Sequence, residues 1–100
     1  MNADPKNGRR YQREQILEEG QLTWGGKTLT VDVLDLSTDQ DRGEIRGFGV
    51  LVPTFLSVKE ECLLQLDVTR YSGQYRCETV YCLDTGFGYR VGLSTQKTVG

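Results

Sequence analysis

"QLTWGGKTLTVDVLDLS", residues Gln21–Ser37, carries the clearest structural signal in this chain of 100 residues. Two β-prone runs flank a Gly-Gly pair, and both glycines can adopt the positive φ that a two-residue hairpin turn requires. In the second run apolar and polar residues alternate, with Leu29, Val31 and Val33 on the apolar side. This stretch therefore predicts a β-hairpin whose second strand buries one face.

The alternation in this second strand shifts by one position. After Val33 the apolar residues are Leu34 and Leu36, so the buried face would change sides if the strand were regular. A bulge or sharp bend near Val33–Leu34 accounts for the shift, and small barrels use such features to turn corners.

Short apolar runs continue along the rest of the chain, separated by turns that contain glycine. The predicted strands are Gly47–Val52, which Pro53 ends, and then Glu61–Thr69, Gln74–Asp84 and Tyr89–Ser94. No amphipathic helix of any length is evident. The sequence therefore predicts an all-β fold, a small antiparallel β-barrel.

The length allows one domain, which we place at residues 9–95, between a disordered tail at 1–8 and a short tail at 96–100. The pattern from Arg9 to Glu19 is weak and is interpreted as a linker that leads into the first strand. No apolar run approaches the roughly 18 residues that span a membrane, and the first residues do not resemble a secretory signal. These observations favour a cytoplasmic protein without a membrane partner.

Residue types that catalysis and metal binding usually recruit are scarce. The three cysteines, Cys62, Cys77 and Cys82, are odd in number and lack a CxxC spacing, which favours reduced, packed thiols. The chain has no histidine, which removes the commonest general base and weakens any case for zinc. We expect no enzymatic activity, no metal and no cofactor.

Charge is distributed unevenly along the chain. Residues 1–13 have a net charge of +3, because four basic residues face Asp4 alone, and the remainder has a net charge of −5. The basic residues are Lys6, Arg9, Arg10 and Arg13. This layout favours a small anionic ligand at one end over a long nucleic acid. Guanidinium groups bind phosphates and stack on flat rings, although a solvated basic tail explains the cluster more readily when it is taken alone.

Asp35 and Ser37 lie two positions apart in a predicted strand, so their side chains point to the same face. A carboxylate can accept paired hydrogen bonds from the N1–H and the 2-amino group of guanine, which adenine does not offer. A strand end followed by a polar loop, in which Ser37 or Asp39 caps a turn, explains the same residues in purely structural terms.

Taken together, these features resemble the PilZ domain. The resemblance runs from RxxxR in "RRYQR" (Arg9–Arg13), through D-x-S at Asp35 and Ser37, to the later strands up to "YRVGLS". PilZ domains are bacterial receptors for cyclic di-GMP, with a barrel of six or seven strands and usually a C-terminal helix. Only "TQKTVG" follows the last strand here, so that helix is expected to be short or absent.

The resemblance also implies the ligand contacts. Arg9 and Arg13 would reach phosphates and guanine faces, Arg10 would add a phosphate contact, and Asp35 and Ser37 would contact a guanine. The family pattern continues as D-x-S-x-x-G, whereas here "TDQDRGEIR" (Thr38–Arg46) separates Ser37 from the preferred glycine, Gly47. We interpret this segment as an insertion beside the ligand; Gly43 is the competing candidate for the motif glycine.

The resemblance suggests a switch in which cyclic di-GMP orders the N-terminal segment and a downstream protein partner reads the new surface. One alternative is a PilZ-fold protein-interaction module that has lost nucleotide binding because of the insertion. Another is a single-stranded nucleic-acid barrel of the OB type, with stacking faces drawn from the later tyrosines: Tyr71, Tyr75, Tyr81 and Tyr89.

Overall fold

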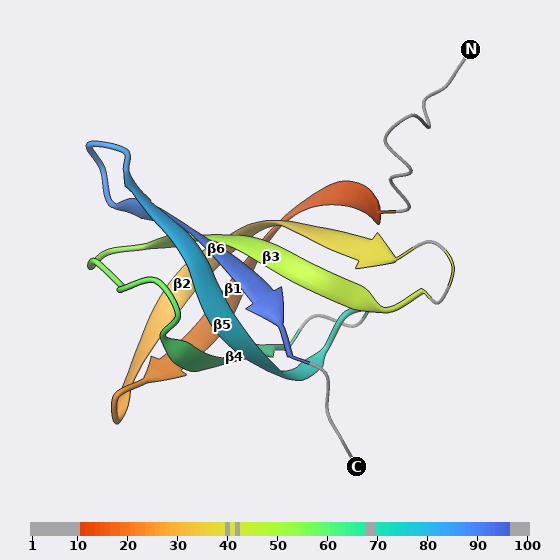
Figure 1. The fold of residues 1–100 in the computed structure, drawn as a ribbon, viewed down its shortest axis with the longest axis horizontal. Helices are drawn as coiled ribbons and strands as arrows, with labels where there is room; N and C mark the ends of the chain where they lie inside the picture. The colour runs from red at the N-terminus through yellow and green to blue at the C-terminus, as the bar shows by residue number, and fades with distance from the viewer. Residues whose placement is uncertain (1–10, 40, 42, 68–69, 97–100) are drawn as a thin grey trace.

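The computed structural model describes residues 11–39, 41, 43–67 and 70–96, and every regular element among them is a β-strand (Figure 1). Six strands follow one another along the chain: β1 (Tyr11–Trp24), β2 (Lys27–Asp39), β3 (Ile45–Val52), β4 (Glu61–Leu66), β5 (Gly73–Asp84) and β6 (Tyr89–Thr95). The all-β prediction is confirmed. No helix among the described residues has the length and apolar character needed to cross a membrane.

The strands form one antiparallel sheet that closes on itself in the order β1-β2-β3-β6-β5-β4. β4 closes the ring by pairing with the second half of β1, where Gly20–Thr23 face Leu66–Leu63. The first half of β1 pairs with β2 alone among the described strands. Closure therefore leaves the Tyr11–Glu19 half of β1 attached to the sheet along one edge.

Side chains that point into the ring form a single apolar core. Every strand contributes to it, and Leu56 adds to it from the loop between β3 and β4. The buried members are Leu22, Val31, Val33, Leu36, Phe48, Val50, Val52, Leu56, Cys62, Leu64, Leu66, Cys77, Val91 and Leu93. Trp24 packs against this core beside the predicted Gly25-Gly26 turn, where both glycines have positive φ.

The three cysteines are free thiols, as the odd count predicts, and two of them lie in the core. Burial raises the pKa of Cys62 to about 11 and that of Cys77 to about 12. Both thiols therefore remain protonated at neutral pH, since the thiolate is disfavoured in apolar surroundings.

A bulge in β2 sits where the apolar alternation shifts. The pairing of β2 with β3 changes register between Val33 and Asp35, and the pairing with β1 changes between Gln15 and Glu18. Leu17, in the bulged part of β1, has a φ of 52°. The bulge lets Val33 and Leu36 both reach the core while Asp35 and Ser37 lie on the outer face.

The interpretation of Arg9–Glu19 as a linker is wrong from Tyr11 onward. Those residues form the first half of β1, in register with β2 from Tyr11 opposite Asp39 to Gln15 opposite Asp35. The segment is polar because both of its faces lie near the surface, which is why it lacks the apolar alternation typical of a half-buried strand. The predicted disordered tail, residues 1–8, lies outside the described residues.

Other predicted boundaries differ by a few residues. β3 begins at Ile45 and β5 at Gly73, one or two positions before their predicted starts, and β6 extends to Thr95. The predicted strand at Glu61–Thr69 is too long, because β4 ends at Leu66.

Candidate functional site

The predicted site residues meet on the outer face of the sheet, around β2. Arg13 in β1 lies directly opposite Ser37 in β2, and Ser37 lies opposite Gly47 in β3. Gly47 in turn faces Ser94 in β6. Directly opposite residues in antiparallel strands share a face, so these four positions form one row across four strands. We call this row the arginine row.

A second row runs beside it, one pleat further along the strands. Asp35 in β2 lies opposite Gln15 on one side and Gly49 on the other. Gly49 faces Gly92 in β6, which faces Tyr81 in β5. We call this row the aspartate row. The structure thus brings Arg13, Asp35, Ser37 and Gly47 onto one face from three strands, whereas Arg9 and Arg10 lie outside the described residues.

The arginine row is open to solvent at its charged end. Arg13 is exposed, and its side chain makes no hydrogen bond or ion pair with another described residue. Ser37 is half-buried. Arg13 lies in β1 and not in a linker as predicted, and pairing with β2 holds its backbone in place.

The aspartate row, by contrast, contains a formed ion pair that the sequence did not predict. Arg90 in β6 donates a hydrogen bond from Nη2 to Oδ2 of Asp35 over 2.8 Å. The side chains are only 30% and 12% exposed, respectively. The pKa of Arg90 is raised, first by its hydrogen bond to Asp35 and second by one to Tyr81. The carboxylate expected to bind guanine therefore already has a cationic partner.

Two glycines make room for this arrangement. A Cβ atom on Gly49 would lie 2.6 Å from Oδ1 of Asp35 and 3.0 Å from Nη2 of Arg90. A Cβ atom on Gly92 would lie 2.3 Å from the ring of Tyr81. Both contacts are far inside van der Waals range, so the ion pair and the tyrosine ring occupy space that only glycine leaves free.

The structure also distinguishes the two candidate glycines of the motif. Gly47 is the one that lies opposite Ser37 in the pairing of β2 with β3, whereas Gly43 precedes the start of β3 at Ile45. Gly43 has a φ of 69° and donates its backbone N–H to the carbonyl of Asp39. Ser37 and Gly47 are paired directly, and the β2–β3 register shifts just beyond them, between Ser37 and Thr38. A ligand-binding role for Gly47 remains a prediction.

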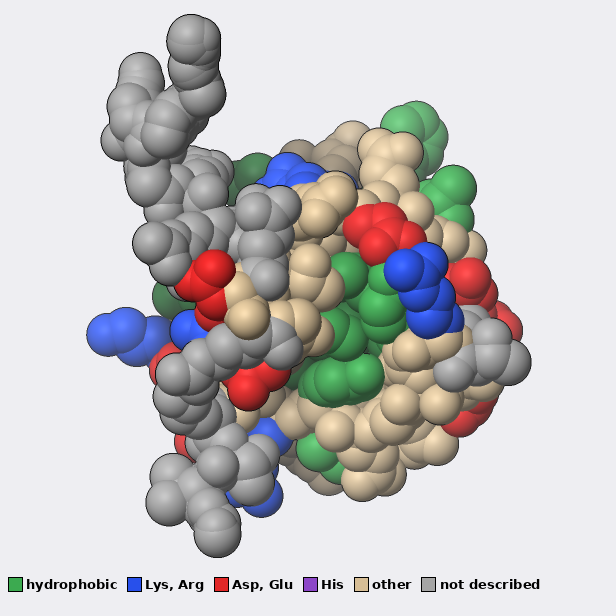
Figure 2. Space-filling view, turned by 90° about the vertical axis from the view of Figure 1, so that its right-hand side faces the viewer, with side chains coloured by type: hydrophobic (Ala, Val, Ile, Leu, Met, Phe, Trp, Pro, Cys, Tyr) green, Lys and Arg blue, Asp and Glu red, His purple; other side chains and the backbone are tan. Residues whose placement is uncertain are grey.

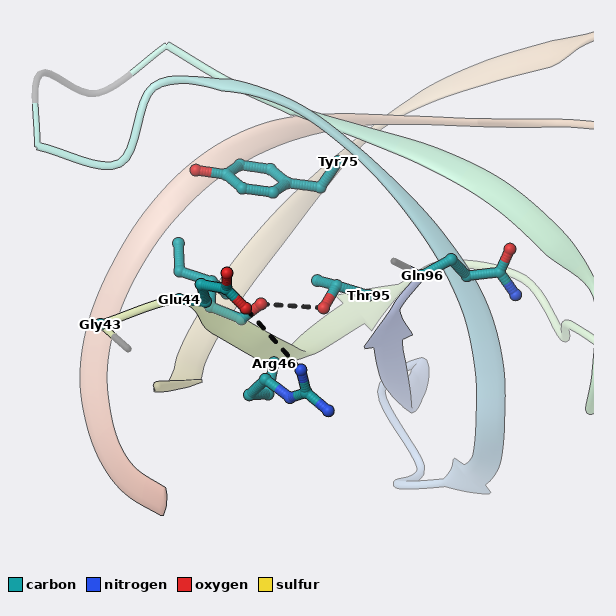
Figure 3. A pocket seen from close by; sticks show the side chains of 7 residues that line it. Gly43, Glu44, Arg46, Tyr75, Thr95 and Gln96 are labelled. Carbon is teal, nitrogen blue, oxygen red and sulfur yellow. Dashed lines mark hydrogen bonds and ion pairs between the residues drawn. The ribbon is translucent and has the colours of Figure 1, made fainter. Parts of the chain in front are cut away.

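A hollow of about 560 Å³ opens beyond the arginine row, where β3 begins and β6 ends (Figure 3). It is lined by Gly43, Glu44, Ile45, Arg46, Tyr75, Thr95 and Gln96. Glu44 and Arg46 approach each other only to 3.9 Å, while Oγ1 of Thr95 donates a hydrogen bond to the carbonyl of Ile45 over 2.8 Å. Neither Asp35 nor Ser37 lines the hollow, so it is separate from the predicted site.

The end of the ring on the right-hand side of Figure 1 faces the viewer in Figure 2, where hydrophobic side chains gather at the centre beside charged ones. Tyr71 and Tyr75 pack against the core, as does Tyr89 elsewhere in the ring. Three of the four tyrosines considered as stacking platforms thus have part of their ring surface covered, which weakens the OB-type alternative.

The described part of the outer face offers the guanidinium of Arg13, the hydroxyl of Ser37 and the partnered carboxylate of Asp35, with Gly47 and Gly49 between them and β6. Such a face can bind a flat anionic ligand by hydrogen bonds and ion pairs. The sequence signals for Arg90 are the alternating glycines Gly47 and Gly49, which leave space for a large side chain, and its being the one charged residue of the strand Tyr89–Thr95. Comparisons with protein families, curated proteins and solved structures give no match to this chain.

Proposed function

We propose that this chain is a bacterial, cytoplasmic receptor for cyclic di-GMP that binds the nucleotide on the outer face of β1, β2 and β3. The observation that carries the proposal is the arginine row, in which Arg13, Ser37 and Gly47 lie in register on neighbouring strands. These positions come from separate parts of the chain and belong to the PilZ pattern. Their convergence supports a shared ligand.

Each group on this face suits one part of the ligand. Arg13 is a free guanidinium that would bind a phosphate, together with Arg9 and Arg10 from the segment before β1. Asp35 uses Oδ2 for Arg90, and a carboxylate has about four acceptor positions, so acceptor capacity remains for the guanine edge. Gly47 would let a flat base approach the backbone.

Binding would be relayed to a downstream protein partner through the segment before β1. Capture of a dianion by Arg9 and Arg10 would hold that segment against the outer face and create a surface that is absent without ligand. Arg13 already belongs to β1, so in this proposal the segment that changes ends near Tyr11. The protein acts by binding, without catalysis or a cofactor.

Calorimetric titration with cyclic di-GMP tests the proposal. We expect micromolar binding by the wild-type protein and at least a tenfold loss in Arg13→Ala, equivalent to about 1.4 kcal/mol. Arg76→Ala is the matched control, because Arg76 is an exposed arginine on β5, outside both rows. Absence of binding by the wild type would contradict the receptor function, and an equal loss in both variants would contradict the role of Arg13.

A protein-interaction module without nucleotide binding is the second candidate. The observation that favours it is the Asp35–Arg90 pair, which occupies part of the carboxylate that the resemblance assigns to guanine. This candidate predicts no heat with cyclic di-GMP or with cyclic di-AMP from a correctly folded protein. The same titration therefore separates the two functions.

A further inference from the structure

Arg90 lies in β6 two residues before Gly92, the β6 member of the aspartate row, and its side chain pairs with Asp35 of that row. It reaches from β6 across β3 to Asp35 on β2, and it crosses β3 at Gly49, the position where a side chain would obstruct it. Tyr81 raises the pKa of Arg90 in addition to Asp35, so the surroundings favour the charged guanidinium. The guanidinium is therefore held against the Asp35 carboxylate, in the space that Gly49 leaves free.

This anchoring fixes Asp35 as well. The side chain of Asp35 is 12% exposed, and a carboxylate this deeply placed needs a charged partner to compensate for lost hydration. Oδ2 accepts from Arg90, while Oδ1 lies over Gly49. The carboxylate thus has one held orientation, whereas an exposed aspartate on a strand would rotate among several.

We propose that Arg90 is a positioning residue that sets guanine specificity: it holds Asp35 so that the carboxylate accepts both hydrogen bonds of the guanine edge. The inference rests on the proposed function and names a residue outside the sequence pattern that led to it. Arg90 acts through Asp35 in this scheme and does not bind the phosphates, which are left to the arginine row.

A double-mutant cycle separates positioning from direct contact. Affinities for cyclic di-GMP and cyclic di-AMP are measured for the wild type, Arg90→Gln, Asp35→Asn and the double variant, with unfolding followed in parallel to confirm folding. We expect Arg90→Gln to weaken cyclic di-GMP binding about tenfold and to leave cyclic di-AMP binding unchanged. In the Asp35→Asn background the same change should have no further effect, because the acceptor pair is already lost.

Arg90→Lys provides the rescue arm. Only one hydrogen bond joins Arg90 to Asp35, so a lysine ammonium should restore part of the discrimination between the two nucleotides. The positioning role would be overturned if Arg90→Gln still weakened cyclic di-GMP binding in the Asp35→Asn background, or if it weakened binding of both nucleotides equally. Arg90 would then be assigned to the phosphates or to folding.

A measurement without ligand keeps this inference distinct from the receptor proposal. In protein with nitrogen-15-labelled arginine, we expect separate Nη proton signals for Arg90 in the wild type and their collapse in Asp35→Asn. Collapsed signals in the wild type would show that Asp35 is not held, and would overturn the inference even if cyclic di-GMP binds. If the wild type binds no cyclic di-GMP, the receptor function and the specificity role fall together, while the signals still decide whether Arg90 positions Asp35.

Discussion

The two rows on the outer face differ in how far they are assembled before any ligand arrives. In the aspartate row, Asp35 and Arg90 are joined at 2.8 Å and mostly shielded from solvent. In the arginine row, Arg13 is exposed and makes no hydrogen bond or ion pair within the described part of the chain. The aspartate row is therefore preorganised to orient a ligand, whereas the exposed charge of Arg13 in the arginine row is available to attract one.

The strands that carry the two rows also differ in how many paired neighbours hold them in the sheet. β2, β3 and β6, which carry the aspartate row, each have paired neighbours on both sides. Among the described strands, the half of β1 that carries Arg13 is paired only with β2. Glu14 adds a link to the loop before β5 through Tyr71 and Arg70. We therefore expect substitutions in the aspartate row to affect stability as well as guanine recognition, and substitutions in the arginine row to affect binding with little change in stability.

The largest expected effect comes from removing the carboxylate of the aspartate row. Asp35→Ala leaves Arg90 without its partner in a partly buried place, and we expect a loss of about 2–3 kcal/mol in the free energy of unfolding. Urea denaturation measures it. Asp32→Ala is the control, because Asp32 is exposed on the same strand and should change stability by less than about 0.5 kcal/mol. Equal losses would show that the pair has no special contribution.

Gly49→Ala should have the next largest effect. Its new Cβ atom would overlap Oδ1 of Asp35 and crowd Arg90, so the pair has to move, at a cost of about 1–3 kcal/mol in unfolding free energy. The cost should shrink in an Asp35→Ala background, because the overlapping oxygen is then absent. A cost of the same size in both backgrounds would mean that strand geometry, and not the ion pair, requires glycine there.

Much of this architecture could be predicted because local patterns report it directly. The Gly-Gly turn, the alternation before Val33 and its shift at Leu34 predicted the β1–β2 hairpin and its bulge. The two-residue spacing of Asp35 and Ser37 placed both on one face whatever the rest of the fold. These features depend only on neighbours in sequence.

The start of β1 and the role of Arg90 could not be predicted in the same way. Tyr11–Glu19 is a strand because β2 supplies its hydrogen-bond partners. Few of its side chains are buried, so the sequence lacks the alternation of apolar and polar residues that would reveal a strand. Arg90 meets Asp35 only because β6 pairs with β3 and β3 with β2 in a particular register. Such contacts between distant parts of the chain can be predicted only once the strand order and register are known.

A smaller effect is expected at the link that holds the first half of β1. Tyr71 donates a hydrogen bond to Oε1 of Glu14 over 2.6 Å, and Tyr71→Phe should cost about 1 kcal/mol in unfolding free energy. Tyr89→Phe is the control, since the Tyr89 hydroxyl bonds to no other described residue. Faster hydrogen exchange should appear at Gln12–Glu14 and not around Asp35. Loosening of both regions would contradict the separation of the two rows.

The same link gives a pH dependence with a definite sign. The pKa of Tyr71 is raised above its ordinary value of 10.0, first by the hydrogen bond to Glu14 and then by burial. Because the pKa of Tyr71 is higher in the folded than in the unfolded protein, this link contributes its full stability to the folded state at pH values below the unfolded pKa. The contribution is lost as the pH rises through the folded pKa. In Glu14→Gln we expect the phenol to titrate at lower pH, as read from the difference in phenolate absorbance between proteins with and without Tyr71. An unchanged titration would exclude this link.

The smallest expected effect concerns the long hairpin beside the arginine row. Asp39 lies two residues beyond Ser37 on β2, and therefore on the same face, where its negative charge opposes binding of a dianion. Asp39→Asn keeps the oxygen that accepts from the N–H of Asp41 and should strengthen cyclic di-GMP binding about twofold, or roughly 0.5 kcal/mol, at low salt only.

Asp84→Asn is the matched control for this hairpin, because Asp84 makes the same kind of contact, accepting from the N–H of Gly86, in the turn between β5 and β6. A gain in Asp39→Asn that vanishes at high salt would show that the insertion weakens the site through charge alone, leaving its geometry intact. A loss of binding would instead give Asp39 a direct role in the site.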